Sequence, residues 1–197
     1  MKRISAILLA AGESKRMGVN KLALPWGRKT VLEHCVDVLL RSKIMEVVVV
    51  LSDRTKALGD RLREPKVKLV MNPNYHRGIS TSIRRGVQAV DRKNDGILIA
   101  LGDHPRLRTK TINALVHALV QEKGKIIVPI FRGRRGHPVL FSPTFAKELL
   151  RLKGDVGARS LLQKHLKSVF EVRTKSEGGV TDMDTWEDYR KISQGKT

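Results

Sequence analysis

The sequence is poor in cysteine, in aromatic side chains and in acidic residues. Cys35 is the one cysteine among 197 residues, which excludes an internal disulfide and a cysteine zinc cluster. A chain of this length can close a hydrophobic core without either. Cys35 falls in an apolar helical pattern, Val31 to Leu40, so we interpret it as a small buried side chain rather than a nucleophile.

Long hydrophobic runs are also absent. No apolar stretch approaches the ~20 residues that a membrane-spanning helix needs. The apolar start, Ile4 to Ala11, is too short for a signal peptide and runs into glycine without a typical cleavage region. We therefore expect a cytoplasmic protein without a membrane segment, and the lone cysteine fits a reducing compartment.

Acidic residues are outnumbered by basic ones. The sequence contains 39 Lys and Arg residues and 19 Asp and Glu residues, which gives a formal net charge of +20. Such a field attracts polyanions, so nucleotides, nucleic acids and acidic proteins are all admissible partners. The basic residues are spread along the chain, however, and 4% aromatic residues leave little surface for stacking bases. We expect a solvated basic surface rather than specific nucleic-acid binding, because charge alone carries no specificity.

Short β-rich runs alternate with amphipathic helical patterns, without repeats or a Pro/Gly-rich linker. This alternation predicts one domain, residues 1–197, folded as a three-layer α/β/α sandwich around a mostly parallel, Rossmann-like sheet. The predicted strands are Ile4–Leu9, Glu46–Leu51, Val67–Met71, Gly96–Leu101, Lys125–Ile130, Pro138–Phe141 and Ser168–Val172. The predicted helices are Thr30–Ser42, Arg54–Leu62, Ile79–Val90, Thr109–Lys123, Pro143–Leu152 and Ala158–His165. Thr109 is predicted to cap its helix and Gly124 to end it.

In open parallel sheets the ligand site lies beyond the carboxyl ends of the strands, so the loops that follow strands are the first candidates. The loop from Ala10 to Lys21 contains Gly12 and Gly18. Glycine lets backbone amides approach an anion, and Arg16 and Lys21 add positive charge for a triphosphate. The spacing fits neither a dinucleotide fingerprint nor a P-loop. An ordinary glycine turn between strand and helix remains the alternative.

Carboxylates occur in two other candidate loops, at Asp103 and at residues 182–184. Asp103 comes directly after the strand at 96–101, where it is placed to hold Mg²⁺; it would equally begin a turn before Pro105. Asp182 and Asp184 alternate, so in an extended segment both would face one metal. Alternatively, Asp184 or Thr185 heads a short helix. The two interpretations of this second segment are compatible.

Three further segments are weaker candidates. Residues 72–82 join a strand to a helix and bring hydroxyls to the helix start, where anions or bases are often received. Residues 132–138 suit a basic hairpin or a contact with an anionic substrate, and residues 154–159 suit a flexible turn before a helix. His104 and His137 each precede proline, and we interpret both as structural.

Taken together and in this order, the loops resemble the molybdopterin nucleotidyltransferase family, within the nucleotide-sugar-transferase-like α/β fold. The resemblance covers nearly the whole chain. Its main motif is Leu9-Ala10-Ala11-Gly12-x-Ser14-x-Arg16-Met17-Gly18 followed by Lys21. The nucleotide-binding residues that it implies are Leu9, Ala10, Ala11, Gly12, Ser14, Lys21, Asn72, Gly78, Ser80, Ser82 and Asp103.

The later segments are similar to those of molybdenum cofactor cytidylyltransferases, and Ala11 stands where the guanylyl branch has glycine. In the cytidylyltransferases the N-terminal half holds CTP and the C-terminal half holds the molybdopterin. The implied residues on the acceptor side are Arg135, His137, Gly154 and Arg159. Two positions depart from the family pattern, Trp186 for proline and His104 for glutamine or methionine, and neither removes a metal ligand.

The implied reaction is CTP + Mo-molybdopterin → molybdopterin cytosine dinucleotide cofactor + pyrophosphate. The attacking phosphate oxygen is already ionised, so the site must supply alignment and charge neutralisation rather than a general base. The resemblance assigns Arg16 and Lys21 to the phosphates, Asp103 to Mg²⁺, and Asp184, or instead Asp182, to the same ion. The alternatives are guanylyl or other nucleotidyl transfer to another phosphorylated acceptor, and a non-catalytic assembly factor that docks on an acidic molybdoenzyme.

Overall fold

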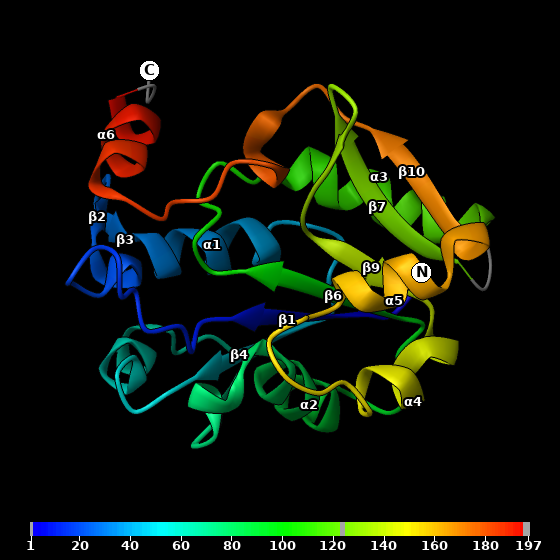
Figure 1. The fold of residues 1–197 in the computed structure, drawn as a ribbon, viewed down its shortest axis with the longest axis horizontal. Helices are drawn as coiled ribbons and strands as arrows, with labels where there is room; N and C mark the ends of the chain where they lie inside the picture. Colours follow the sequence, from blue (N-terminus) through cyan, green and yellow to red (C-terminus); the bar gives the residue numbers. More distant parts are fainter. Residues whose placement is uncertain (1, 123–124, 195–197) are drawn as a thin grey trace.

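The structure is a computed structural model that describes residues 2–122 and 125–194. An eight-stranded sheet runs through it in the order β10-β7-β9-β6-β1-β4-β5, with β8 paired to β7 (Figure 1). The strands are β1 (Ile4–Leu9), β4 (Glu46–Leu51), β5 (Val67–Met71), β6 (Gly96–Leu101), β7 (Ile126–Phe131), β8 (Arg134–Arg135), β9 (Val139–Phe141) and β10 (Val169–Arg173).

The centre of the sheet is parallel. Strand β1 lies between β4 and β6 and pairs with both in parallel, and β5 continues the same direction beyond β4. All six residues of β1 are buried, as expected for a strand covered on both faces. Strand β9 is antiparallel to β6 and β7, so the sheet is mixed but mostly parallel. The carboxyl ends of β1 and β6 therefore lie side by side at one edge.

Helices cover both faces of the sheet (Figure 1). On one face, α1 (Val31–Leu40) and α3 (Thr109–Gln121) bury their apolar sides in one core cluster, which also includes Ile192 of α6 (Trp186–Gln194). On the other, α2 (Ile79–Ala89), α4 (Ala146–Leu149) and α5 (Arg159–Lys164) pack in the second cluster. The predicted three-layer α/β/α architecture is confirmed.

Short elements complete the fold. Strands β2 (Pro25–Trp26) and β3 (Lys29–Thr30) form a small antiparallel sheet, and Thr30 then caps α1 in a capping box with Glu33. The 3₁₀ helices are η1 (Lys21–Ala23), η2 (Lys56–Arg61), η3 (Tyr75–Arg77), η4 (Pro143–Phe145), η5 (Leu166–Ser168) and η6 (Glu177–Gly179).

Two predictions about helices were wrong. The segment predicted as a helix over 54–62 forms the 3₁₀ helix η2, and its buried Gly59 is a poor helix former. A Cβ at Gly59 would lie 3.0 Å from methyl groups of Leu51 and Leu69, so a larger residue there would crowd the sheet.

Thr109 does not cap α3, because Arg108 is the N-cap residue and the Thr109 hydroxyl donates to the Val38 carbonyl. Gly124, predicted to end that helix, lies outside the described residues.

Cys35 is buried on α1, and its thiol donates to the Gly102 carbonyl at 3.3 Å. Burial raises the pKa of this thiol far above its ordinary value, with the nearby Asp103 carboxylate adding to the effect. The side chain is therefore protonated, as expected of a structural rather than a nucleophilic cysteine.

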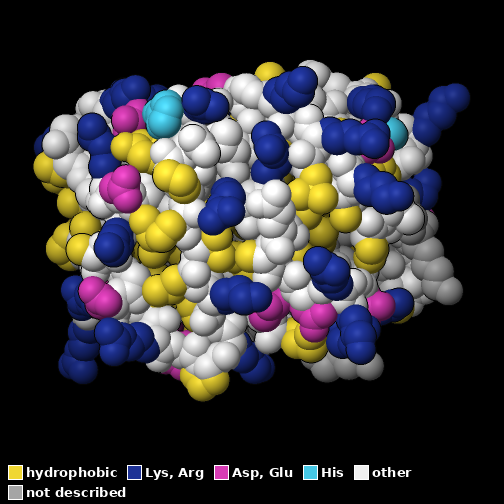
Figure 2. Space-filling model, turned by 90° about the horizontal axis from the view of Figure 1, so that it is seen from below, with side chains coloured by type: hydrophobic (Ala, Val, Ile, Leu, Met, Phe, Trp, Pro, Cys, Tyr) yellow, Lys and Arg dark blue, Asp and Glu magenta, His cyan; other side chains and the backbone are white. Residues whose placement is uncertain are grey.

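Lys and Arg side chains are scattered over the face shown in Figure 2, with apolar and acidic side chains between them. This distribution agrees with the solvated basic surface that the sequence predicts. Among the described residues, no helix is both long and apolar enough to cross a bilayer.

Candidate active site

The glycine-rich loop, residues 10–20, connects β1 to η1. Ser14 and Gly18 both have positive φ, 52° and 69°, so the backbone turns sharply twice. The Ser14 hydroxyl accepts a hydrogen bond from the Lys21 amide at 3.2 Å, and the Asn20 side chain accepts one from the Leu22 amide at 3.1 Å. These bonds fix the start of η1 and with it the position of Lys21.

The turn after β6 brings Asp103 to the same place. The Gly102 amide donates to the Leu9 carbonyl at 3.0 Å, so the ends of β6 and β1 stay joined beyond the sheet. A Cβ at Gly102 would lie 3.1 Å from that carbonyl oxygen, which is a tight contact. Glycine at this position therefore allows the close approach that places Asp103 beside the glycine-rich loop.

Lys21 joins two carboxylates that are distant in the sequence. Its ammonium lies 2.5 Å from Asp103 Oδ2 and 2.8 Å from Asp184 Oδ1. The three side chains are 13%, 19% and 25% exposed, in the order Lys21, Asp103, Asp184. Burial alone would lower the pKa of Lys21, but the two carboxylates outweigh it and hold the pKa above its ordinary value. The ammonium is therefore a permanent positive charge between two carboxylates.

Arg16 adds a second cation to Asp184. Its guanidinium lies 2.6 Å from Asp184 Oδ2, and the Arg16 side chain is largely exposed. Burial works to raise the pKa of Asp184, yet Lys21 and Arg16 together lower it. Asp182, the alternative ligand, is exposed, and it is Asp184 that lies at Lys21.

The helix-cap interpretation of this segment also holds. The Asp188 carboxylate accepts from the Thr185 amide at 2.8 Å, and the Thr185 hydroxyl accepts from the Asp188 amide at 3.1 Å. This reciprocal pair starts α6 directly after Asp184. One short segment thus provides both a helix start and a carboxylate for the site.

A cavity of about 620 Å³ opens between the glycine-rich loop and the start of α2. Of the residues predicted to bind a nucleotide, those that line it are Leu9, Ala11, Gly12, Ser14, Lys21, Gly78, Ser82 and Asp103. Ala10, Asn72 and Ser80 are buried in its surroundings instead. The amide of Asn72 donates to the hydroxyls of Thr81 and Ser82 at 2.9 Å each, so Asn72 orders the wall rather than facing the cavity.

The structure adds lining residues that the sequence did not single out, notably Glu13, Lys15, Tyr75, Arg77 and Asp155. A charge pattern hints at some of them: Glu13 and Lys15 lie in the predicted loop and pair at 2.7 Å. Asp155 lies in the turn at 154–159 that the sequence marked as a candidate, but the sequence does not reveal its partner: its carboxylate accepts from the Ile79 amide at the start of α2, 76 residues away.

The loop that carries Asp155 packs against the start of α2. A Cβ at Gly78 would lie 2.6 Å from the Gly154 carbonyl, so the two segments touch through glycine. The Ser80 amide donates to the same carbonyl at 3.3 Å. A residue predicted for the acceptor side, Gly154, thus lies against residues predicted for the nucleotide side.

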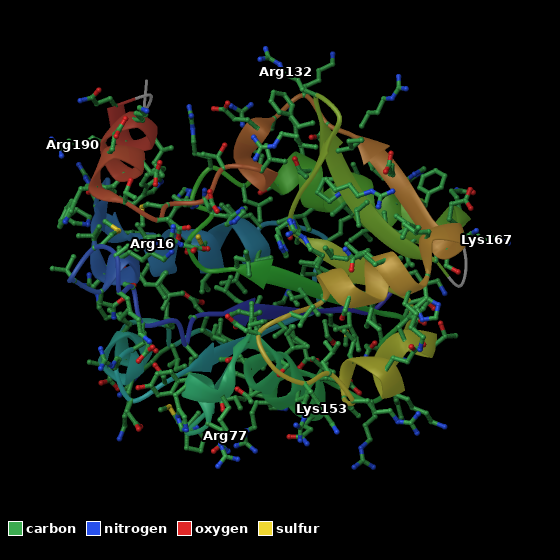
Figure 3. All side chains as sticks on the ribbon, viewed as in Figure 1. Arg16, Arg77, Arg132, Lys153, Lys167 and Arg190 are labelled. Carbon is green, nitrogen blue, oxygen red and sulfur yellow. The ribbon has the colours of Figure 1, made fainter. Side chains whose placement is uncertain are left out.

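The other residues predicted for the acceptor side lie elsewhere. Arg135 lies on β8, and its guanidinium pairs with the Glu171 carboxylate at 2.6 Å. Strands β7 and β8 form the basic hairpin that the sequence predicts, with Arg132 at its tip (Figure 3). Burial, with His104 adding to it, lowers the pKa of His137 to about 4, so its ring is neutral at pH 7. Within the described part of the chain, Arg135, His137 and Arg159 are not among the residues lining the 620 Å³ cavity. Their contact with an acceptor stays a prediction.

The two carboxylates suit a hard divalent cation. Asp103 and Asp184 converge on the Lys21 ammonium; Lys21 and Asp103 line the cavity, and Asp184 lies behind them at Lys21. Mg²⁺ is commonly held by one or two carboxylates while phosphates and water complete its octahedron. Across residues 2–122 and 125–194, no group of three or more His, Cys, Asp or Glu side chains could hold a metal by itself. The donor set therefore fits an ion that arrives with a phosphate ligand.

Three relatives match along nearly their whole length. The purine catabolism protein PucB of Bacillus subtilis (strain 168) is 34% identical over 197 residues, covering 94% of each chain. The nicotine blue oxidoreductase of Paenarthrobacter nicotinovorans is 29% identical, covering 96% of each. The molybdenum cofactor cytidylyltransferase of Escherichia coli (strain K12) is 27% identical, covering 96% of this chain and 95% of that one.

Among solved structures, Rv0371c from Mycobacterium tuberculosis H37Rv superimposes with a TM-score of 0.85 at 28% identity, covering 98% of this chain and 99% of that one. Its complex with manganese gives a TM-score of 0.80 at 27% identity, covering 98% and 100%. Residues 6–169 match the family model of the MobA-like NTP transferase domain. The chain therefore belongs to the MobA-like NTP transferase family and is a nucleotidyltransferase.

Proposed function

We propose that the protein transfers CMP from CTP to a molybdopterin phosphate in an Mg²⁺-dependent reaction that releases pyrophosphate. One observation carries this proposal: Lys21 and Asp103 line the cavity that the glycine-rich loop forms, and Asp184 shares the Lys21 ammonium with Asp103. A triphosphate on the loop would bring its phosphates to this group of charges.

The chemistry needs positioning more than acid–base catalysis. A terminal phosphate oxygen of the acceptor bonds to the α-phosphorus of CTP, and the bond from that phosphorus to the bridging oxygen breaks, so pyrophosphate leaves with its electron pair. Lys21 and Arg16 neutralise charge that builds up on the leaving phosphates, while loop amides hold them in line. Asp103 and Asp184 would hold Mg²⁺, which lowers the charge repulsion between the two anions when it is bound.

The identity of the substrates rests on similarity. The Escherichia coli relative is named a molybdenum cofactor cytidylyltransferase and matches along 95% of its length. Ala11, the position at which the cytidylyl and guanylyl branches differ, lines the cavity. We further propose that the C-terminal half binds the molybdopterin and that the basic surface favours an acidic molybdoenzyme as the recipient of the product.

A thermal-shift panel tests the nucleotide. CTP with Mg²⁺ is expected to raise the unfolding temperature most among CTP, GTP, ATP and UTP, because a ligand that binds the native state stabilises it by mass action. At a hundredfold excess over Kd the gain is ~2.7 kcal/mol, or roughly 5–10 °C for a chain of this size. Selective stabilisation by GTP would refute the cytidine assignment. Pyrophosphate release with the acceptor then separates an enzyme from a non-catalytic assembly factor.

Paired substitutions test the second carboxylate. Asp184→Asn should weaken Mn²⁺ binding in the presence of CTP by about tenfold, the scale of one charge-assisted contact. Asp182→Asn is the matched control, since Asp182 is two residues away and exposed. Free Mn²⁺, measured by electron paramagnetic resonance, provides the readout. A larger effect at Asp182 than at Asp184 would reverse the assignment.

A further inference from the structure

Helix α6 is hydrogen-bonded to the segment that carries the glycine-rich loop. The Trp186 indole N–H donates to the Met17 carbonyl at 3.2 Å, and the Tyr189 hydroxyl donates to the Pro25 carbonyl at 2.7 Å. Met17 lies in the loop itself, and Pro25 begins the β2–β3 hairpin that follows it. Figure 1 shows α6 beside this hairpin, so residues 186–194 lie against a segment more than 150 residues earlier in the sequence.

Apart from these two bonds, α6 is held by a small apolar contact with the core. Ile192 is the buried residue of the helix, and Tyr189 packs partly buried against the same core. The Trp186 side chain is 42% exposed, and Arg190 points outward (Figure 3). With so little buried apolar surface, the position of α6 depends on its specific contacts with the loop and the hairpin.

The segment that carries Asp184 is held on both sides: Met183, directly before it, is fully buried in the core cluster, and α6 follows it. Asp184 immediately precedes the helix, and its amide donates to the Asp188 carboxylate at 3.2 Å within the helix cap. Its own carboxylate reaches back to Arg16 and Lys21, which flank Met17 in the sequence. Two sets of contacts therefore join residues 184–186 to residues 16–21. One is the hydrogen bond from Trp186 to Met17, and the other is the pairing of Asp184 with Arg16 and Lys21.

We infer that Trp186 and Tyr189 are positioning residues that hold Asp184 at the metal site, and that their hydrogen bonds to the glycine-rich loop and the hairpin set the affinity for the divalent cation. The inference rests on the proposed function, because it assumes that Asp103 and Asp184 bind the cation. It adds two side chains that touch neither nucleotide nor metal and that act through Asp184.

The test uses the full chain with Tyr189→Phe, which removes only the hydroxyl, and Trp186→Phe, which removes the N–H donor and replaces the indole by a smaller aromatic ring. Mn²⁺ binding is measured by electron paramagnetic resonance in the presence of inorganic triphosphate, which makes the result independent of the base. Each variant is expected to raise the Mn²⁺ dissociation constant about fivefold, the scale of one net hydrogen bond. In turnover with CTP, the Mn²⁺ concentration for half-maximal rate should rise by the same factor while kcat at saturating Mn²⁺ stays unchanged.

Glu187→Gln is the matched control. It breaks the Glu187–Lys191 pair on the exposed side of α6 and leaves the contacts with the loop and the hairpin in place, so Mn²⁺ affinity should not change. Wild-type Mn²⁺ affinity in both Phe variants would overturn the inference alone. Weakened binding in Glu187→Gln to the same extent would also overturn it, because general loosening of α6 would then explain the effect. Failure of the wild type to bind Mn²⁺ with triphosphate would overturn the metal site and the inference together. If one Phe variant does not fold, the other decides.

Discussion

Asp103→Asn is expected to reduce kcat for pyrophosphate release by about 10³-fold, or ~4 kcal/mol of transition-state stabilisation. Asn has the shape of Asp and can still accept a hydrogen bond from Lys21, but it carries no charge. The change therefore removes one of two carboxylates that face Lys21 and leaves the turn after β6 intact. Loss of a metal ligand affects the chemical step most, because the ion neutralises charge that develops as pyrophosphate leaves.

Steady-state release of pyrophosphate from CTP, measured across a range of Mg²⁺ concentrations, checks this result. The unfolding temperature of the variant without ligand should stay close to that of the wild type, since Asn keeps the shape of Asp and Asp184 still pairs with the Lys21 ammonium. Rescue of the rate by high Mg²⁺ would show weakened metal binding, which still supports the assignment. Undiminished turnover at low Mg²⁺ would remove Asp103 from the metal site.

The sequence predicted the strands more accurately than the helices. The bounds of β1, β4, β5 and β6 agree residue by residue with the prediction; for β4 and β6 the reason is an apolar run that ends at a polar residue or glycine, Ser52 and Gly102. Helix ends depend on single side chains whose partners are tertiary. The Thr109 hydroxyl donates to Val38, 71 residues away, and no local pattern reveals that choice.

In the site, too, local sequence patterns predict some residues, while tertiary contacts decide the others. Lys21 and Asp103 each follow a strand of the parallel sheet, so topology alone brings their loops to one edge. Asp184 was one of two candidates, and the choice between them depends on how α6 packs. The contacts of Asp155 with Ile79 and of Trp186 with Met17 join segments 76 and 169 residues apart. Hydrophobic periodicity carries no information about such pairs.

Lys21 has two roles that a single substitution can separate. In the structure its ammonium is bound to both carboxylates that we assign to the cation, so ammonium and metal compete for the same oxygens. A triphosphate offers the ammonium other oxygens and releases the carboxylates for the metal. Binding of nucleotide and of metal should therefore be mutually favourable.

Lys21→Met is expected to lower kcat/KM for CTP by about 10²-fold, or ~2.7 kcal/mol, because it removes a partly buried charge that we propose neutralises the leaving phosphates. Mn²⁺ affinity in the absence of nucleotide should rise in the same variant, since the competing ammonium is gone and both carboxylates remain. Lys164→Met is the matched control: Lys164 is 65% exposed, pairs with Glu148 and does not line the cavity, so both measurements should stay near the wild type. A fall in both turnover and Mn²⁺ affinity at Lys21 would mean that the ammonium organises the carboxylates for the metal instead of competing with it.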